Sequence, residues 1–440
     1  MGNTLEMTFA PEQIAELPTL EDIILFLAGL TDDFEDDGGW LSQATFPPNC
    51  SWNLPMVDFF NLADNDKFIV TQTGSKRHTL KPNLRNRPFL YRGQRKDFGR
   101  IISGFTRDAL SGNGVLSREE AREYHMINNL KAEDFIALLK THPLFMMLDR
   151  GIVLDPERKP IFINMNYYGL AQHYGFHTGL IDFTTDIDAA AFFACTRYLG
   201  DDEYEPVTDI EKDQYGVVYV HKILPEATFK YLGFSTIGLQ LYPRSGAQKG
   251  VCYNEGISRL NVNKLVRPVY FRHVPEVSKR VYDMLKGGKL LFPKDSISKY
   301  AQVILSGNEI SGETFAQNLY SNHDDLRENL SVLEKHNINV NWHKRMHFTN
   351  EMLQEVQKDF RDNLWEIFCN QIYFADDRKG KQMHESLLNL PYNPAYKHYF
   401  NVNEYERITA YDADLHRRAR RNSWKYGAQN EAYMSRSAEK

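Results

Sequence analysis

Two segments of the chain carry residue types that suit chemistry on a polar ligand, and the first contains Arg92. The apolar run 88–91 leads into Arg92 and Gly93, so the arginine is expected to end a strand where glycine lets a ligand approach the backbone. A guanidinium presents a planar pair of donors that fits a phosphate or a carboxylate. The structural alternative is an ion pair in the core, for which Asp182 is the obvious partner, and one arginine can serve both roles.

The second segment, 172–194, has the pattern of a polar turn followed by a strand and a helix. It opens with polar residues and two glycines, a composition typical of a turn. The apolar run 180–183 predicts a buried strand, and the alanine-rich run 189–194 predicts a tightly packed helix. Thr184, Thr185 and Asp186 lie between them as candidate helix caps. Such a segment presents hydroxyls and a carboxylate at the rim of a sheet, although a purely structural strand–helix connection has the same pattern.

Three blocks of sequence, taken together, resemble the FRG domain. They are Tyr-Arg-Gly-Gln at 91–94, the segment 172–194, and Gln-Lys-Gly-Val at 248–251, and the matching region extends over residues 85–255. The usual Pro-Thr-Arg-Leu-Leu-Asp-Trp-Thr of that family appears here as His-Thr-Gly-Leu-Ile-Asp-Phe-Thr. The basic residue of the pattern is therefore replaced by Gly179.

The same blocks are similar, more distantly, to the pattern of ADP-ribosyltransferases. That pattern has an arginine on a first strand, a hydroxyl-bearing strand that runs into an alanine-rich helix, and a late strand with Gln or Glu. The resemblance implies NAD as a substrate, with the arginine on its phosphates or ribose and a carboxylate stabilising the positive charge that develops as nicotinamide leaves. Gly250 stands where the pattern has its glutamate. A carboxylate must then come from elsewhere, with Asp182 as first choice and Glu255 as second.

We expect Arg92, His173, Asp182, Thr184 and Gln248 to converge on one concave site. The candidate catalytic residues are Asp182, His173 and Gln248. The candidate residues for binding NAD are Arg92, Gly93, Gln94, Tyr174, Thr178, Thr184 and Thr185. Two other classes stay open: a module that binds a nucleotide or a protein partner without turnover, and a purely structural domain. A redox use of NAD is disfavoured, because the chain lacks the glycine-rich dinucleotide fingerprint.

Composition excludes several other classes of function. Apolar residues make up 42% of the 440 residues and charged residues 25%, as in ordinary globular proteins. A net charge of −6 argues against a nucleic-acid partner. The four cysteines match no zinc or redox spacing, and His173 and His177 lie beside glycines that oppose a metal-binding helix, so no metal site is expected. No apolar run approaches a membrane span of about 20 residues, which favours a cytoplasmic protein.

The elements that must position these residues predict an α+β fold, because helices and strands do not alternate strictly. We expect a partly helical N-terminal region at 1–78, an FRG-like domain with a mixed sheet at 79–300, and a mainly helical region at 301–440. Strands are expected at 68–70, 180–183, 216–221 and 267–272. Helices are expected at 23–27, 118–127, 132–140 and 189–194, with an apolar helical stripe over 353–368. A solvated loop is expected at 200–214, a loop followed by a strand at 242–251, and a basic helix face at 417–421.

Overall fold

The structure is a computed structural model that describes residues 9–28, 67–72, 77–83, 89–104, 106, 116–157, 159–222, 233–254, 261–322, 325–361, 364–374 and 377–401. Glu255 and the basic run 417–421 lie outside these residues. By its internal contacts the chain divides into two compact units, each assembled from segments distant in sequence. The first unit consists of Met1–His125, Asn164–Asp295 and Asn370–Phe374, and the second of Met126–Ile163, Ser296–Cys369 and Ala375–Lys440. The predicted domain boundaries after residues 78 and 300 stay predictions.

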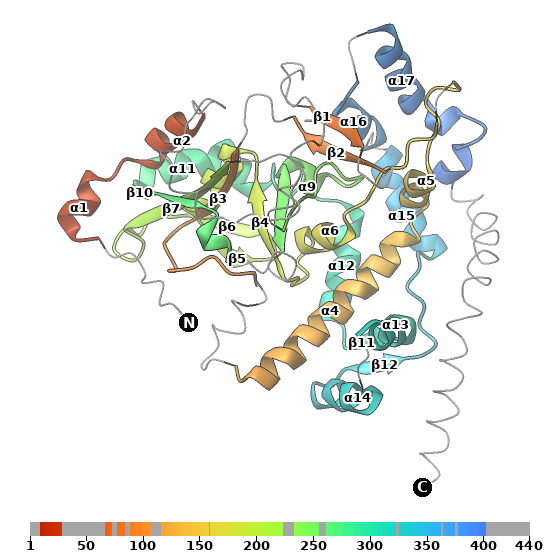
Figure 1. Ribbon diagram of the computed structural model, residues 1–440, viewed down its shortest axis with the longest axis horizontal. Helices are drawn as coiled ribbons and strands as arrows, with labels where there is room; N and C mark the ends of the chain where they lie inside the picture. The colour runs from red at the N-terminus through yellow and green to blue at the C-terminus, as the bar shows by residue number, and fades with distance from the viewer. Residues whose placement is uncertain are drawn as a thin grey trace, which may run out of the picture. The chain divides into compact units, whose positions relative to one another are not determined.

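Both units combine helices with strands, which confirms the predicted α+β class. The first unit is built on a six-stranded sheet with the strand order β10-β7-β3-β4-β9-β8 (Figure 1). All neighbouring strands in this sheet are antiparallel. The strands are β3 (Phe89–Gln94), β4 (Leu180–Thr184), β7 (Tyr215–Lys222), β8 (Phe234–Thr236), β9 (Gly250–Asn254) and β10 (Arg267–Arg272). The strands predicted at 180–183, 216–221 and 267–272 are thereby confirmed.

Both faces of the sheet are buried, because successive side chains of a strand point to opposite sides. In β3, Phe89 and Tyr91 belong to the hydrophobic core on one face and Leu90 to the core on the other. In β7, Val218 and Val217 divide in the same way. This two-sided burial explains why these strands are continuous apolar runs rather than alternating ones.

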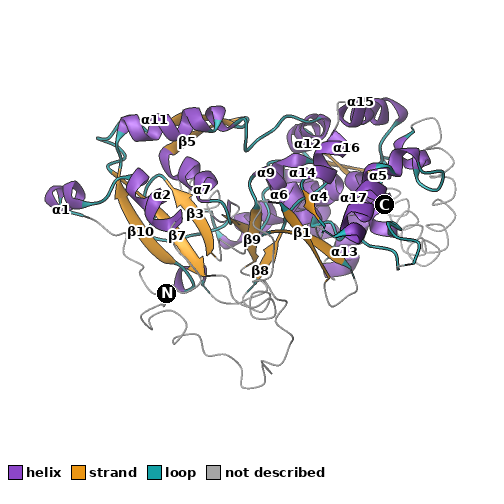
Figure 2. Cartoon of the chain, turned by 90° about the horizontal axis from the view of Figure 1, so that it is seen from above, coloured by secondary structure: helices purple, strands orange, loops and turns teal. Residues whose placement is uncertain are grey.

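The sheet is almost divided between β3 and β4. These two strands share one register pair, Tyr91 with Thr184, whereas β3 pairs with β7 from Phe89 to Gln94 and β4 pairs with β9 along its whole length. Figure 2 shows β10, β7 and β3 as one group of strands, with β9 and β8 as another. Main-chain groups that face the neighbouring strand beyond the single pair therefore need partners other than a β-ladder.

One face of the β10-β7-β3 half is covered by α7 (Ile187–Cys195), which lies over β3 with α2 (Leu20–Ala28) and α11 (Pro275–Met284) nearby (Figure 2). The approach is close, because a Cβ atom added at Gly93 would come within 1.8 Å of the carbonyl oxygen of Ala190. Asp186 caps α7 by accepting hydrogen bonds from the backbone N–H groups of Asp188 and Ala189. The predicted strand, cap and alanine-rich helix are thus confirmed.

Two segments that were expected to be loops contain regular structure. In the acidic segment 200–214, β6 (Glu203–Pro206) forms an antiparallel hairpin with β5 (Thr196–Gly200), which ends where the segment begins, and Asp213 is buried rather than solvated. The segment before β9 forms the short helix α9 (Pro243–Ala247), which begins with proline. Proline suits the first turn of a helix as well as a loop, since the missing N–H has no helical partner there. The strand expected after this segment is confirmed as β9.

The remaining elements of the first unit are not strands of the large sheet. They are α1 (Pro11–Glu16), α6 (Tyr167–His173), η2 (Val262–Lys264), η3 (Lys286–Gly288), and a small sheet of β13 (Ile372–Tyr373), β1 (Phe68–Gln72) and β2 (His78–Pro82). The expected strand at 68–70 and helix at 23–27 are confirmed by β1 and α2.

The second unit is mainly helical. Its elements are the C-terminal part of α4 (Arg118–Lys140), α5 (Pro143–Arg150), α12 (Ser296–Ser306), β11 (Glu309–Ser311), α13 (Gly312–Asn322), α14 (Leu326–Lys335), β12 (Asn339–Asn341), α15 (Asn350–Arg361), α16 (Leu364–Asn370), α17 (Arg378–Leu388), η4 (Leu390–Tyr392) and η5 (Lys397–Phe400). The two helices expected at 118–127 and 132–140 are one continuous helix, because no glycine or proline interrupts them. The stripe over 353–368 belongs to two helices, and Ile367 in it is 50% exposed. Within the described ranges, no helix has the length and apolarity needed to cross a membrane.

Candidate functional site

Arg92 lies where β3 and β4 part, and its contact with β4 is to the main chain. Its Nη1 donates a hydrogen bond to the carbonyl oxygen of Asp182 at 2.7 Å, just beyond the single register pair of the two strands. The expected ion pair with the Asp182 carboxylate is therefore not the contact that joins them. The guanidinium instead satisfies a carbonyl group for which the sheet supplies no ladder partner, and the side chain stays half-buried.

The carboxylate of Asp182 is oriented by an amide rather than by a cation. Its Oδ1 accepts a hydrogen bond from Nε2 of Gln172 at 2.5 Å, and the Thr178 hydroxyl donates in turn to Oε1 of the same glutamine. Within the described residues, no hydrogen bond reaches Oδ2 of Asp182. One oxygen of a half-buried carboxylate is thus fixed by the fold while the other keeps its capacity to interact with a ligand.

His173, at the C-terminal end of α6, is buried, with 9% of its surface exposed. Its Nε2 is enclosed and has no hydrogen-bond partner in the part of the chain that the structure describes. Burial lowers the pKa of His173 below its ordinary value, and the charge on Arg244 lowers it further, whereas the Asp182 carboxylate and the Gln248 side chain raise it. The net lowering makes the neutral imidazole the resting form.

Gly250 begins β9 directly in front of this imidazole. A Cβ atom added at position 250 would lie 2.9 Å from Nε2 of His173. A glutamate at this position would have to displace the histidine. The late-strand carboxylate of the transferase pattern is therefore absent from the sequence, and the space beside the backbone of Gly250 is occupied by His173.

Thr184 and Gln248 connect the end of β4 to the segment that leads into β9. The Thr184 hydroxyl donates to the carbonyl oxygen of Gln248 at 2.6 Å, and Nε2 of Gln248 donates to the carbonyl oxygen of Leu291 at 3.1 Å. Thr185 is buried nearby, and its backbone N–H donates to the carbonyl oxygen of Lys249 at 3.3 Å. These hydrogen bonds join the end of β4 to the segment before β9, and the side-chain amide of Gln248 is hydrogen-bonded to a main-chain carbonyl group.

Of the expected residues, Gly93 lies in close contact with α7. The side chain it lacks would point into α7, so the packing of β3 against that helix requires glycine there. Gln94, next along β3, is half-buried. The remaining expected residues lie at the junction of β3, β4, β9 and the end of α6. They include no cluster of three or more metal-ligating side chains, and none occurs elsewhere among the described residues.

Comparison with protein families decides what kind of domain this site belongs to. Residues 87–203 match the model of the FRG domain family. The chain contains an FRG domain. The match includes Arg92, His173, Asp182 and Thr184, while Gln248 lies beyond its end. Comparisons of the chain with curated proteins and with solved structures give no match.

Arg244 was not predicted from the sequence, and it organises the side of the site next to His173. Its side chain, on α9, is only 6% exposed and forms a 2.8 Å ion pair with Asp202 in the β5–β6 turn. Nη1 also donates to the carbonyl oxygen of His173 at 3.3 Å, and the guanidinium lies 4.8 Å from the centre of the Tyr174 ring. A signal was present, because an arginine close to the apolar run 237–242 is expected to be buried and paired.

Tyr174, which was expected to bind NAD, is fixed within the domain. Its hydroxyl donates to Oδ2 of Asp295 at 2.5 Å, and burial raises its pKa, with the Asp295 charge adding to that rise. Tyr204 of β6 was not expected near the site. Burial, and then the negative charges of Asp202 and Asp182 among its neighbours, raise its pKa too. Both phenols therefore stay neutral across the physiological range.

Proposed function

We propose that the FRG domain binds a dinucleotide such as NAD where β3 and β4 diverge, and that it breaks the bond between nicotinamide and ribose. The observation that most supports this is the placement of Arg92 and Asp182 on adjoining strands, joined by the 2.7 Å contact to the Asp182 carbonyl. A guanidinium carries a positive charge and presents its N–H donors in a planar fork, a geometry that suits phosphate oxygens. A cation for the phosphates and a carboxylate for the sugar are the two charges that this reaction needs.

The reaction consumes NAD and water and yields nicotinamide, ADP-ribose and a proton. The C1′–N bond breaks, its electron pair remains on the nicotinamide nitrogen, and the positive charge that develops at C1′ is stabilised by Oδ2 of Asp182. A water oxygen then bonds to C1′, and the proton that the water loses is released to solvent. Gln172 contributes by keeping the Asp182 carboxylate in one orientation.

A second function is favoured by Gly250 and His173. Because the transferase pattern has its glutamate where Gly250 stands, the FRG domain can be a module that binds a nucleotide without cleaving it. Such a module would need Arg92 and the surrounding polar side chains but would not depend on the charge of Asp182. The two functions therefore differ in one measurable quantity, the release of nicotinamide.

The deciding experiment uses the purified full chain and NAD. We expect nicotinamide release, measured by chromatography, and an NAD-dependent rise in the melting temperature, because a ligand that binds only the folded state stabilises it. A rise in melting temperature without nicotinamide assigns the non-catalytic function. If neither occurs, both functions are wrong and the polar residues of the junction serve the fold alone.

A further inference from the structure

The tip of the β5–β6 hairpin is a two-residue turn. Gly200, Asp201 and Asp202 follow one another with φ angles of 110°, 49° and 61°. Positive φ at both central residues is typical of a type I′ hairpin turn, in which aspartate is accommodated well. A register shift between Tyr198 and Gly200 shows that the hairpin is irregular at the same point.

Asp202, at the tip of the hairpin, forms an ion pair with Arg244. The two partners are in different environments, because the Arg244 side chain is 6% exposed and that of Asp202 is 39% exposed. The buried guanidinium requires a negative partner, and a carboxylate from a partly exposed turn supplies it. In the described part of the chain, this ion pair is the one polar side-chain contact that Asp202 makes.

Arg244 is held in place independently of Asp202. Its guanidinium lies over the Tyr174 ring and donates to the carbonyl oxygen of His173. Tyr174 is fixed in turn by its 2.5 Å hydrogen bond to Asp295. The guanidinium would therefore keep its position if Asp202 were replaced by another anion. A preorganised, buried guanidinium with a replaceable partner is an anion-binding site.

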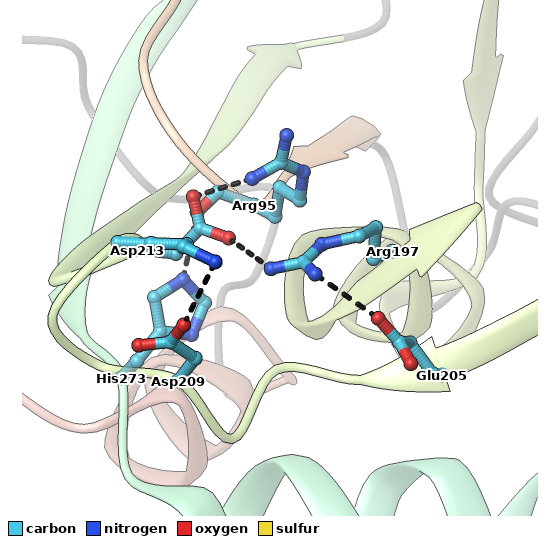
Figure 3. Close-up of polar contacts among 7 residues, drawn as sticks. Arg95, Arg197, Glu205, Asp209, Asp213 and His273 are labelled. Atoms are coloured by element: carbon cyan, nitrogen blue, oxygen red, sulfur yellow. Dashed lines mark hydrogen bonds and ion pairs between the residues drawn. The ribbon is translucent and has the colours of Figure 1, made fainter. Parts of the chain in front are cut away.

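The base of the hairpin is attached to other segments by a network of ion pairs and hydrogen bonds (Figure 3). Arg197 of β5 pairs with Glu205 of β6 at 3.1 Å and with Asp213 at 3.4 Å. The Asp213 carboxylate, whose side chain is 2% exposed, also pairs with Arg95 beyond the end of β3. The carbonyl oxygen of Arg95 accepts a 2.7 Å hydrogen bond from Nε2 of His273. The tip can thus move while this network keeps the base in place.

We propose that Asp202 occupies a phosphate-binding site, and that a phosphate or pyrophosphate group of the ligand displaces it from Arg244 as the hairpin tip swings away. Asp202 then acts as an internal competitor for the ligand. This site is separate from Arg92, and it does not require that the FRG domain cleave anything.

The test compares two neighbouring aspartates in the full-length protein, with inorganic pyrophosphate as the probe. Asp202→Asn removes the competing charge, and we expect pyrophosphate to bind about tenfold more tightly, since a charge-assisted pair is lost from the unliganded state. Asp201→Asn changes the net charge equally in the same turn, but Asp201 makes no ion pair within the described residues, so its affinity should equal that of the parent. Asparagine tolerates the left-handed region at both positions. Isothermal titration calorimetry gives the dissociation constants.

Two further measurements complete the test. Arg244→Lys added to Asp202→Asn should abolish the gain, because lysine keeps the charge but lacks the two-pronged donor. Hydrogen exchange of the parent, which needs no variant to fold, should show faster exchange at the amides of 200–203 when pyrophosphate is present. Equal tightening by both aspartate variants would reduce the effect to net charge and overturn the proposal. Absence of pyrophosphate binding, or unchanged exchange at 200–203, would also overturn it.

This outcome is distinguishable from that of the proposed function. If Asp202→Asn binds pyrophosphate more tightly but the protein releases no nicotinamide from NAD, the phosphate site is supported and the enzymatic function is excluded. If the protein releases nicotinamide but the two aspartate variants bind pyrophosphate with the same affinity, the enzymatic function is supported and the phosphate site is excluded.

Discussion

At the scale of single residues, Asp182 and Arg92 differ in the hydrogen bonds that their side chains make within the fold. The side chain of Asp182 receives one hydrogen bond, from Gln172, and asparagine at 182 has an oxygen that can accept the same bond. Asp182→Asn should therefore fold normally but lose the negative charge. We expect nicotinamide release to fall about 10²- to 10³-fold with little change in the affinity for NAD. Steady-state kinetics with a melting curve of each protein checks this, and an unchanged turnover would exclude Asp182 as the stabilising group.

Arg92 is expected to affect binding rather than turnover. A lysine at 92 can donate either to the Asp182 carbonyl or to a phosphate, but it cannot make the two-pronged contact of a guanidinium. We expect Arg92→Lys to weaken NAD binding about tenfold, as the loss of one charge-assisted hydrogen bond predicts. Calorimetric titration with NAD measures the effect. If the melting temperature falls and the affinity stays constant, Arg92 serves only the fold.

His142 makes stability depend on pH. It is buried among Phe145, Phe348 and Phe360, its Nδ1 accepts a hydrogen bond from the N–H of Leu144, and burial lowers its pKa to about 3. An unfolded histidine has a pKa of about 6.5, so between about pH 6.5 and 3 the unfolded state binds the additional proton. The free energy of unfolding should therefore fall with decreasing pH in this window, by up to about 1.4 kcal/mol per pH unit.

The variant His142→Asn isolates this contribution. Asparagine can still accept the hydrogen bond that caps α5, but it does not titrate. Denaturant unfolding at several pH values should give a shallower pH dependence for the variant than for the parent, whatever its stability at pH 7. His221, whose pKa burial lowers to about 4, contributes to the slope of both proteins and cancels in the comparison. If the free energies of unfolding of the variant and the parent depend on pH in the same way, folding does not lower the pKa of His142.

At the scale of elements, the sequence was informative wherever local chemistry decides the structure. The strand β4, the Asp186 cap and α7 follow one another without interruption, and each could be predicted from residues within its own segment. The hairpin β5–β6 could not, because its acidic residues resemble a solvated loop. What buries Asp213 is the pair Arg95 and Arg197, which come from other segments. Burial of a charge depends on partners that a local pattern does not contain.

The candidate site shows the same division. Arg92 and Asp182 were identified because arginine beside glycine and a carboxylate in a strand are conspicuous residue types. Arg244 and Asp202 were not predicted, because the residues around each of them give no sign that it forms an ion pair. The two side chains meet only in the folded structure. The divergence of β3 from β4 could not be predicted either, because the sequence of a strand does not show where its pairing with a neighbouring strand ends.

The approach of β3 to α7 can be tested with two glycines. Gly93→Ala would place a methyl group 1.8 Å from the Ala190 carbonyl oxygen and 2.7 Å from the Ala194 nitrogen, both of which are backbone atoms that cannot rotate away. We expect a loss of more than about 3 kcal/mol in the free energy of unfolding. Gly179→Ala is the control, because no atom lies within 4 Å of its added Cβ, and it should be neutral or slightly stabilising. Equal effects of the two substitutions would contradict the close packing at Gly93.

At the scale of the whole molecule, neither unit is a continuous stretch of chain. The second unit draws on Met126–Ile163 as well as on the C-terminal segments. Leu130 of α4 belongs to the hydrophobic core that contains Ile310 and Phe315. Asp134, one turn further along α4, accepts hydrogen bonds from the backbone N–H and the hydroxyl of Ser311 at 3.0 and 2.7 Å. The C-terminal helical region therefore depends on a segment that lies far before it in the sequence.

This dependence predicts how the fragment 301–440 behaves by itself. Without α4 its core loses Leu130, and Ser311 loses the buried carboxylate that satisfies it, so the fragment should not form a single well-packed state. We expect a broad thermal transition by circular dichroism, in contrast to a sharp one for the full chain. Adding a peptide that spans 126–163 should increase the helical signal beyond the sum of the two spectra. A sharp, cooperative transition of the fragment alone would show instead that the contacts with α4 are dispensable for its fold.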